Sequence, residues 1–167
     1  MSHIEHRAAA PTSVRCYVLT ISDSRTEATD TSGRVIQDLL SGNGHQVTGR
    51  QILPDDPARV RAALRAQLAN PDVQAILTTG GTGISSRDNS YEAIDSLLEK
   101  RLTGFGELFR ALSYQEIGAA AILSRACAGT SHGKVILSVP GSEHAVRLAM
   151  TKLILPELGH LVREAAR

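Results

Sequence analysis

The sequence has little of what marks the more specialised classes of protein. It contains no tryptophan, aromatic residues make up 3% of its 167 residues, and its formal net charge is only +1. These values exclude the aromatic stacking surface of single-strand binders and the broad basic surface of other nucleic-acid-binding proteins. No apolar run approaches the length of a membrane span, and no apolar core of a signal peptide is visible. We therefore expect a cytoplasmic protein that binds neither nucleic acid nor a membrane.

Cysteine is also scarce. Cys16 and Cys127 lie far apart, and neither belongs to a C-x-x-C motif or to a cluster with metal-ligand spacing. Such an isolated pair indicates buried free thiols in a reducing compartment rather than a disulfide or a structural zinc site.

The remaining composition is that of an ordinary globular domain. Hydrophobic residues make up 42% and charged residues 21% of the chain, and its length suits one domain with a substantial core. We expect this domain to span residues 14–167, preceded by a flexible tail over residues 1–13 that ends in an Ala-Ala-Ala-Pro break.

Strand-like and helix-like segments alternate along the chain. Strands are expected at residues 14–21, 46–53, 73–78 and 134–139, and helices are expected after the caps Ser32, Asp56, Ser90 and Ser142. Further helical segments are expected at 106–117 and, shorter, at 119–126, and Pro156 should interrupt or kink the last helix. This alternation predicts βαβ units, and so an α/β fold: a single three-layer α/β/α domain with a mostly parallel sheet.

Small, hydroxyl or acidic residues follow every predicted strand. The four exits carry Ser22-Asp23, Pro54-Asp55-Asp56, Thr79-Gly80-Gly81-Thr82-Gly83 and Pro140-Gly141-Ser142. Ligands of parallel α/β sheets bind beyond the carboxyl ends of the strands, where the winding direction reverses. The four exits therefore favour one shared polar crevice.

The glycine run at residues 80–83 is the strongest single motif. Glycine lets backbone N–H groups approach an anion closely, and the neighbouring hydroxyls add donors. A P-loop is excluded because no Lys follows Gly83, and a dinucleotide fingerprint is weakened because Ser86 replaces its third glycine and the run follows the third strand. A tight strand-to-helix turn remains the structural alternative.

Aspartates in these loops allow two interpretations. Asp55 or Asp56 would cap the helix at Pro57, and Asp88 or Ser90 the following one. One acid is enough for a cap, so the Asp55-Asp56 pair leaves one carboxylate over. Asp55 and Asp88 converging on the crevice would suit Mg²⁺, which binds through one or two carboxylates together with substrate phosphates. Asp30 is interpreted as a turn or cap residue.

In several of its motifs the chain resembles the MoaB/MogA family of molybdenum cofactor biosynthesis, which includes molybdopterin adenylyltransferase domains. The motifs occur in the family's order, as residues 19–23, 30–33, 53–55, 79–83, 87–88 and 140–142. Gly104-Phe105-Gly106-Glu107, with residues 112–113 and 116–118 after it, looks like the MoaB branch. The resemblance covers residues 14–161.

This resemblance implies a molybdopterin-binding fold and Mg²⁺- and ATP-dependent adenylylation of molybdopterin with release of pyrophosphate. It implies Asp55 and Asp88 as the catalytic, Mg²⁺-holding acids. Substrate-binding residues carried over from it are Ser22, Asp23, Thr79, Gly80, Gly81, Thr82, Gly83, Arg87, Glu107, Ser113, Pro140, Gly141 and Ser142. It also implies a homotrimer or homohexamer that works with other proteins of the pathway. A non-catalytic pterin-binding or scaffolding paralogue is the alternative, and the presence of Arg87, Asp88 and Asp55 favours the enzyme.

Overall fold

The fold was taken from a computed structural model that describes residues 2–167. In chain order its elements are α1 (His3–Ala8), β1 (Arg15–Ile21), α2 (Thr31–Gly42), β2 (Gln46–Leu53), α3 (Pro57–Leu68), β3 (Ala75–Thr79), α4 (Ser90–Asp95), β4 (Lys100–Arg101), α5 (Thr103–Ile117), the 3₁₀ helix η1 (Gly118–Leu123), β5 (Cys127–Ser131), β6 (Lys134–Val139), α6 (Glu143–Ala149), the π-helix η2 (Met150–Ile154) and α7 (Leu155–Ala165). Within residues 2–167 none of the helices combines the length and apolar character that a membrane crossing requires.

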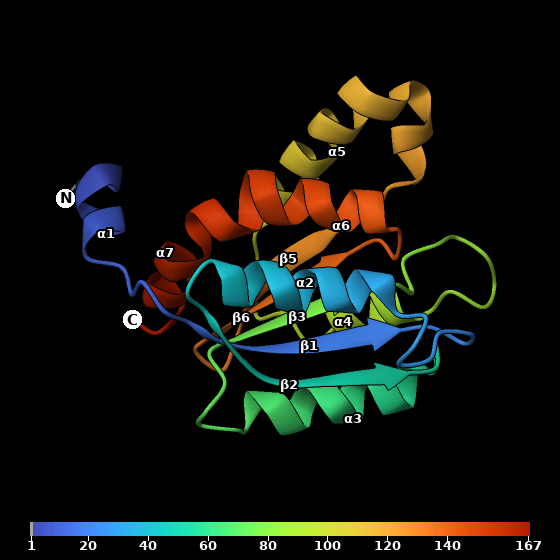
Figure 1. The fold of residues 1–167 in the computed structure, drawn as a ribbon, viewed down its shortest axis with the longest axis horizontal. Coiled ribbons are helices and arrows are strands. Elements are labelled where there is room, and N and C mark those ends of the chain that lie inside the picture. Colours follow the sequence, from blue (N-terminus) through green and yellow to red (C-terminus); the bar gives the residue numbers. More distant parts are fainter. Residues whose placement is uncertain (1) are drawn as a thin grey trace.

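One six-stranded sheet, in the order β2-β1-β3-β6-β5-β4, forms the centre of the molecule (Figure 1). The β1–β2, β1–β3 and β3–β6 pairs are parallel, whereas β5 pairs antiparallel with both β6 and β4. From β1 the chain winds first to β2 on one side and then to β3 on the other. The predicted mostly parallel sheet is confirmed, and its winding direction reverses between β1 and β3.

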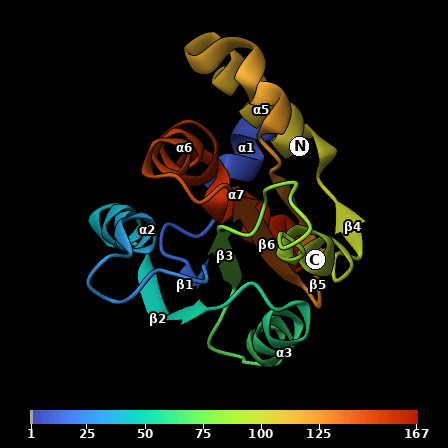
Figure 2. The same cartoon turned by 90° about the vertical axis from the view of Figure 1, so that its right-hand side faces the viewer.

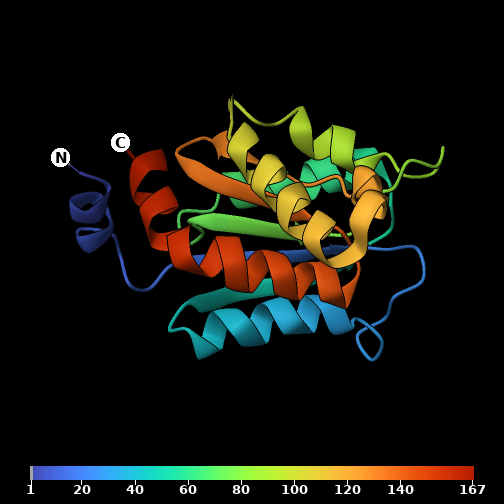
Figure 3. The same cartoon turned by 90° about the horizontal axis from the view of Figure 1, so that it is seen from above.

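Helices cover both faces of this sheet, and each face has its own aliphatic core (Figures 1 and 3). The larger core packs apolar residues of α2, α5, α6 and α7 against the face that carries Val18, Leu77 and Leu137. The smaller core packs α3 and α4 against the face that carries Leu19 and Ile76. Alternate residues of a strand point to opposite faces, so two covered faces require the nearly continuous apolar strands that the sequence contains. The three-layer prediction is confirmed.

Two elements on one side of the sheet differ from the sequence prediction. The expected short helix at residues 119–126 is the 3₁₀ helix η1, which ends at Leu123, and the chain then enters strand β5. Its sequence, Cys-Ala-Gly-Thr-Ser, has few of the β-branched and aromatic residues that mark strands, so tertiary pairing with β6 determines its conformation. Strand β4 has 2 residues, which is too few for a recognisable alternation of apolar and polar residues in the sequence.

Two helix caps also differ from the prediction. Asp30, not Ser32, caps α2, because its side chain accepts from the Gly33 N–H. Ser90 is the first residue of α4 rather than its cap, and its hydroxyl is directed elsewhere. The caps predicted at Asp56 and Ser142 are confirmed.

The N-terminal segment contains a helix that the sequence analysis does not predict. Helix α1 begins with a capping box, in which Ser2 accepts from the Glu5 N–H while Glu5 accepts from the Ser2 N–H. It lies beside α7 (Figure 3), and His6 of α1 contacts Glu164 of α7. The reciprocal cap stabilises a short helix in the segment expected to be a flexible tail.

The last helical run is continuous across the expected break at Pro156. Pro156 lies in the first turn of α7, where its missing N–H costs little. The π-helical segment Met150–Ile154 comes directly before it. This wider turn accommodates the proline without ending the helical run.

Both cysteines are free, as predicted, and burial raises the pKa of each thiol to about 12. At pH 8 only about one thiol in 10,000 is then a thiolate, the reactive form. We expect a disulfide thiol reagent at pH 8 to leave the folded protein unmodified over minutes and to modify two thiols once the chain is unfolded in denaturant. A fast equivalent in the folded state would contradict the buried position of Cys16 or the raised pKa of the half-buried Cys127.

Candidate functional site

A polar pocket lies at the carboxyl ends of the central strands, at the reversal point between β1 and β3. Figure 2 views the molecule from this end. The pocket has a volume of about 360 Å³ and is lined by Thr20, Ile21, Ser22, Arg25, Asp30, Ser32, Thr79, Gly80, Gly141 and Ser142. The predicted shared crevice therefore exists, and three of the four strand exits contribute to its walls.

The loop after β3, residues 80–89, is here called the glycine loop, and its first residues have a backbone that only glycine adopts readily. Gly80 and Gly81 have φ angles of +94° and +68°. A Cβ at Gly80 would lie 2.1 Å from the carbonyl oxygen of Ile21, at the end of β1. This close approach joins the loops that follow β1 and β3 into one wall of the pocket.

Arg87 connects the glycine loop to the loop after β1. Its guanidinium forms two hydrogen bonds to Asp23, with Nε to Oδ2 at 2.8 Å and Nη2 to Oδ1 at 2.9 Å. The Arg87 guanidinium, followed by the N–H of Asp55, holds the pKa of Asp23 below its usual value. Asp23 in turn raises the pKa of Arg87. This pair fixes the two loops relative to each other at an exposed position.

Asp55 follows β2 and is 5% exposed. Its Oδ1 accepts from the Ser90 hydroxyl at 2.6 Å and from the Asn89 N–H at 3.3 Å, at the start of α4. Its own N–H donates to Asp23. The helix that Asp55 stabilises is thus α4, on the other side of the loop cluster, and not α3. Its Oδ2 makes no hydrogen bond within residues 2–167.

Asp88 lies inside the glycine loop and folds back over it. Its Oδ2 accepts from the N–H of Ser85 at 3.1 Å and from the hydroxyl of Ser85 at 2.5 Å. A Cβ at Gly83 would lie 2.5 Å from the same oxygen. Asp88 is the neighbour of Asn89, whose N–H is bound by Asp55, so the two predicted acids belong to one connected cluster.

Asp30 anchors the floor of the pocket and is 1% exposed. Its carboxylate accepts from the hydroxyl of Thr20 and from the guanidinium of Arg50, both at 2.8 Å. Ser32 donates to the carbonyl oxygen of Gly141 at 2.7 Å, which holds the loop after β6 against α2. The cap interpretation of Asp30 is confirmed, and the guanidinium of the half-buried Arg50 compensates the buried charge of this carboxylate.

Arg125 supports the glycine loop from outside the pocket. Its Nε donates to the carbonyl oxygen of Thr82 at 2.8 Å, and its Nη2 donates to that of Gly83. Its Nη1 pairs with Glu92, and its guanidinium lies 4.4 Å from the centre of the Tyr91 ring. The hydrogen bond from Arg125 holds the pKa of Glu92 below its usual value.

The predicted site residues that line this pocket are Ser22, Thr79, Gly80, Gly141 and Ser142. Other predicted residues lie in the adjoining strand-exit loops without lining it: Asp23, Asp55, Gly81, Thr82, Gly83, Arg87, Asp88 and Pro140.

Glu107 and Ser113 lie further away, in α5. Glu107 of α5 lines a second pocket of about 250 Å³, together with Tyr91, Arg110 and Cys127. Ser113 is buried within α5. Conversely, Thr20, Arg25, Asp30 and Ser32 line the strand-end pocket without having been predicted to bind substrate. Arg25 could have been predicted to line the pocket, because it lies in the same loop after β1 as Ser22 and Asp23.

The strand-end pocket, with Gly80, Gly141, its hydroxyls and Arg25, lies at the topological switch point of an α/β sheet, where proteins of this class bind their ligands. Comparison with known proteins identifies the class further. Residues 17–160 match the family described as "probable molybdopterin binding domain", and the chain belongs to this MoaB/MogA family.

Relatives and solved structures agree with this assignment. The chain is 54% identical to molybdenum cofactor biosynthesis protein B of Halalkalibacterium halodurans (98% of this chain and 97% of the relative), and 48% identical to the protein of that name from Bacillus subtilis (98% and 97%). A crystal structure of a molybdenum cofactor biosynthesis protein B superposes with a TM-score of 0.90 at 54% identity (93% and 98%). The tungsten cofactor synthesizing protein MoaB from Pyrococcus furiosus gives 0.85 at 37% identity (95% and 100%).

Proposed function

We propose that the chain acts in molybdenum cofactor biosynthesis and adenylylates molybdopterin. In this reaction an oxygen of the terminal phosphate of molybdopterin attacks the α-phosphorus of ATP. One phosphorus–oxygen bond forms, the bond between the α-phosphorus and the bridging oxygen breaks, and pyrophosphate leaves with that electron pair. The observation that carries the proposal is the glycine wall of the strand-end pocket, with its positive φ angles and neighbouring hydroxyls. Phosphoryl-type transfer needs mainly positioning and compensation of charge.

The residues of the pocket suit this task. The N–H of Gly80 already donates to the carbonyl oxygen of Val139, so the backbone N–H groups of Gly81 and the residues after it would bind phosphate oxygens. Arg25 adds a positive charge at the pocket wall, and the Ser22 hydroxyl already accepts from the Arg25 N–H at 3.0 Å. The pairing of Asp30 with Arg50 holds the floor of the pocket below Ser22 and Arg25 in place. The residues of this pocket would bind the two reacting phosphate groups and hold them in position for the transfer.

We propose that Asp55 and Asp88, beside this pocket, would hold a Mg²⁺ ion. Each uses one carboxylate oxygen to hold the loop cluster, while its second oxygen has no hydrogen bond from the described residues. Oxygen ligands from one or two carboxylates, completed by substrate phosphates, are the usual Mg²⁺ environment in proteins. When bound, the ion supplies neutralisation of the charge on the phosphates.

The same hydrogen bonds would also be present in the alternative, a non-catalytic molybdopterin-binding paralogue. Asp55 stabilises the start of α4 and Asp88 closes the turn at Ser85, so both acids have structural roles without any catalysis. The direct test is incubation of the chain with molybdopterin, ATP and Mg²⁺, followed by detection of pyrophosphate and adenylyl-molybdopterin. Pterin binding without pyrophosphate release selects the paralogue.

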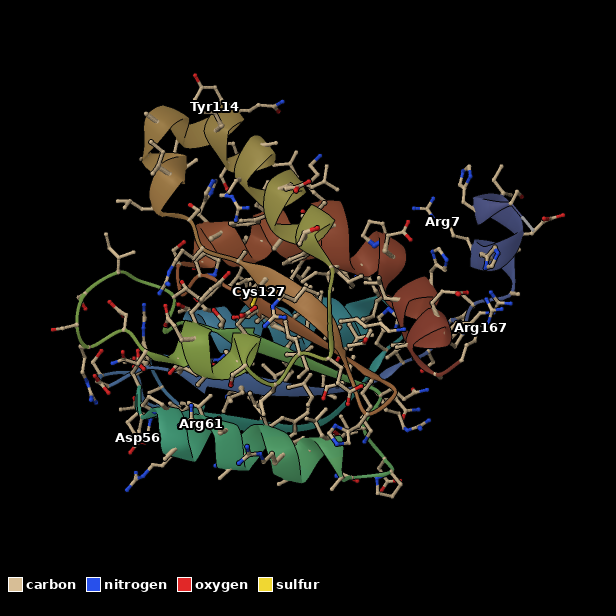
Figure 4. All side chains as sticks on the ribbon, turned by 180° about the vertical axis from the view of Figure 1, so that it is seen from behind. Arg7, Asp56, Arg61, Tyr114, Cys127 and Arg167 are labelled. Atoms are coloured by element: carbon tan, nitrogen blue, oxygen red, sulfur yellow. The ribbon has the colours of Figure 1, made fainter. Side chains whose placement is uncertain are left out.

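We further propose that the active form is a homotrimer or homohexamer. Helices α5 and η1, residues 103–123 and here called the arm, project from the domain (Figure 1). The arm exposes most of the large apolar side chains found on the surface, and Tyr114 lies on its outer side (Figure 4). They are Leu108, Tyr114, Ile117, Ile122 and Leu123, between 48% and 81% exposed. An apolar patch of this kind favours a protein–protein contact.

Replacement of an arm residue should therefore disrupt assembly. Ile122 is 81% exposed, so Ile122→Asp removes apolar contact area and should shift the sedimentation coefficient from that of an oligomer toward that of the 17.8 kDa chain. Ile4→Asp, at a 67% exposed isoleucine of α1, is the matched control and should leave the assembly unchanged. A wild-type protein that sediments as a monomer would overturn the proposal of an oligomer.

A further inference from the structure

Three potential metal ligands meet where the two ends of the chain lie side by side, away from the strand-end pocket. His6 comes from α1, and His160 and Glu164 come from α7. One ligand atom from each lies within 4.8 Å of the others. His160 and Glu164 are four residues apart, so they share one face of the helix. The histidines are half-buried and the glutamate is exposed.

The spacing of two of these atoms is close to that of ligands on one ion. Nδ1 of His6 and Oε1 of Glu164 are 3.0 Å apart. Two ligands bound to tetrahedral zinc at about 2.0–2.1 Å are separated by roughly 3.4 Å. Only a small adjustment of these two side chains is therefore needed to accept an ion between them.

A neighbouring carboxylate fixes the tautomer of His160. Its Nδ1 lies 2.9 Å from Oε2 of Glu157, a distance at which the N–H donates to the carboxylate. This hydrogen bond leaves the lone pair on Nε2. A carboxylate that binds the second ring nitrogen and fixes the tautomer is the usual support of a histidine that binds a metal. Glu157 is itself paired with Arg7 of α1.

The guanidinium of Arg163 already lies in this cluster, but its position conflicts with the hydrogen bonding of His6. Nη1 of Arg163 lies 3.0 Å from Nδ1 of His6 and 2.9 Å from Oε1 of Glu164. Nδ1 of His6 faces a donor on Arg163 and an acceptor on Glu164, and one ring nitrogen cannot satisfy both, because it carries either a proton or a lone pair. A metal ion would accept the nitrogen lone pair and the carboxylate oxygen together.

We propose that His6, His160 and Glu164 bind one divalent transition-metal ion of the zinc class, which fastens α1 to α7 and displaces the guanidinium of Arg163. Two imidazoles and one carboxylate form a ligand set that zinc accepts, with water in the fourth position. The site is separate from the proposed magnesium site and does not depend on the proposed reaction.

The test uses the full chain with Zn²⁺ or Co²⁺ alone. We expect one equivalent of Zn²⁺ by calorimetry and a Co²⁺ absorption spectrum of tetrahedral type. His6→Ala, His160→Ala and the conservative Glu164→Gln should each remove this equivalent, whereas Glu157→Gln should weaken it about 10- to 100-fold. Arg163→Gln should strengthen binding because it removes the competing cation. Absence of a stoichiometric Zn²⁺ equivalent in the wild type overturns the proposal.

The matched control is the exposed pair His132–Glu99, which joins a histidine and a glutamate at 3.5 Å without the third ligand. His132 has a φ of +52°, a region that asparagine tolerates, so His132→Asn preserves the fold and should keep the Zn²⁺ equivalent. As a second readout, Zn²⁺ should slow tryptic cleavage after Arg7 in the wild type and not in His160→Ala. Equal loss of Zn²⁺ in His132→Asn, or cleavage that Zn²⁺ does not slow, would contradict the assignment.

Discussion

Asp88→Asn is expected to reduce the rate of molybdopterin adenylylation by about 100- to 1,000-fold, because a neutral amide replaces a carboxylate proposed to hold the Mg²⁺ ion that neutralises the phosphate charge. The fold should remain, since the side-chain oxygen of asparagine can still accept from the N–H and hydroxyl of Ser85. The measurement is pyrophosphate release with molybdopterin, ATP and Mg²⁺, alongside a thermal unfolding scan and a pterin-binding titration.

Asp56→Asn is the matched control for this loss. Asp56 is a neighbouring acid whose carboxylate caps α3, where it accepts from the N–H groups of Ala58 and Arg59. Asparagine is an equally good cap, so this variant should keep both stability and activity. If Asp88→Asn turns over as fast as Asp56→Asn, Asp88 has only its role in the Ser85 turn, and the non-catalytic alternative gains support.

Gly80→Ala should have the largest effect on stability. Its Cβ would lie 2.1 Å from the backbone oxygen of Ile21, at a φ of +94° that side chains rarely adopt. Because backbone rather than a flexible side chain is in the way, β1 and β3 would have to separate. We expect a loss of about 3 kcal/mol or more, or a fall in melting temperature of about 10 °C.

Gly42→Ala provides the comparison, because Gly42 is the last residue of α2 and a Cβ there has no neighbour within 4 Å. This variant should unfold within about 1 kcal/mol of the wild type. Urea denaturation of both variants separates the effect of losing a glycine from the effect of the contact at Ile21. Equal midpoints for the two variants would show that the loops after β1 and β3 are not closely joined.

Much of the fold could be predicted because the strands that form its centre carry strong local signals. Residues 46–53 and 134–139 were predicted with the bounds that the structure has, since apolar and β-branched runs bounded by turn residues leave little choice. Strand β5 was missed because its small residues favour no conformation by themselves, and its pairing with β6 determines that it is a strand. Helix α1 could have been predicted from its capping box, Ser2 and Glu5, whereas its packing against α7, at the other end of the chain, leaves no local signal.

Part of the candidate site could also be predicted from the sequence. The rule for parallel sheets places every strand exit at one end, so Ser22, Gly80 and Gly141 were correctly expected to share a pocket. The partners of the acids could not be read from the sequence, because the contact of Asp55 with Ser90 joins residues 35 positions apart. Single-chain patterns likewise gave no sign that Glu107 lines a separate pocket.

Arg125 connects the glycine loop to the base of the arm. It lies two residues beyond the end of η1, yet its guanidinium holds the carbonyl oxygens of Thr82 and Gly83. With these carbonyl groups turned toward Arg125, the shape of the glycine loop depends on the backbone at the base of the arm. A displacement of the base of the arm would therefore be transmitted to the loop through these two hydrogen bonds. The side of the molecule that exposes apolar residues and the side that faces the pocket are therefore mechanically linked through one side chain.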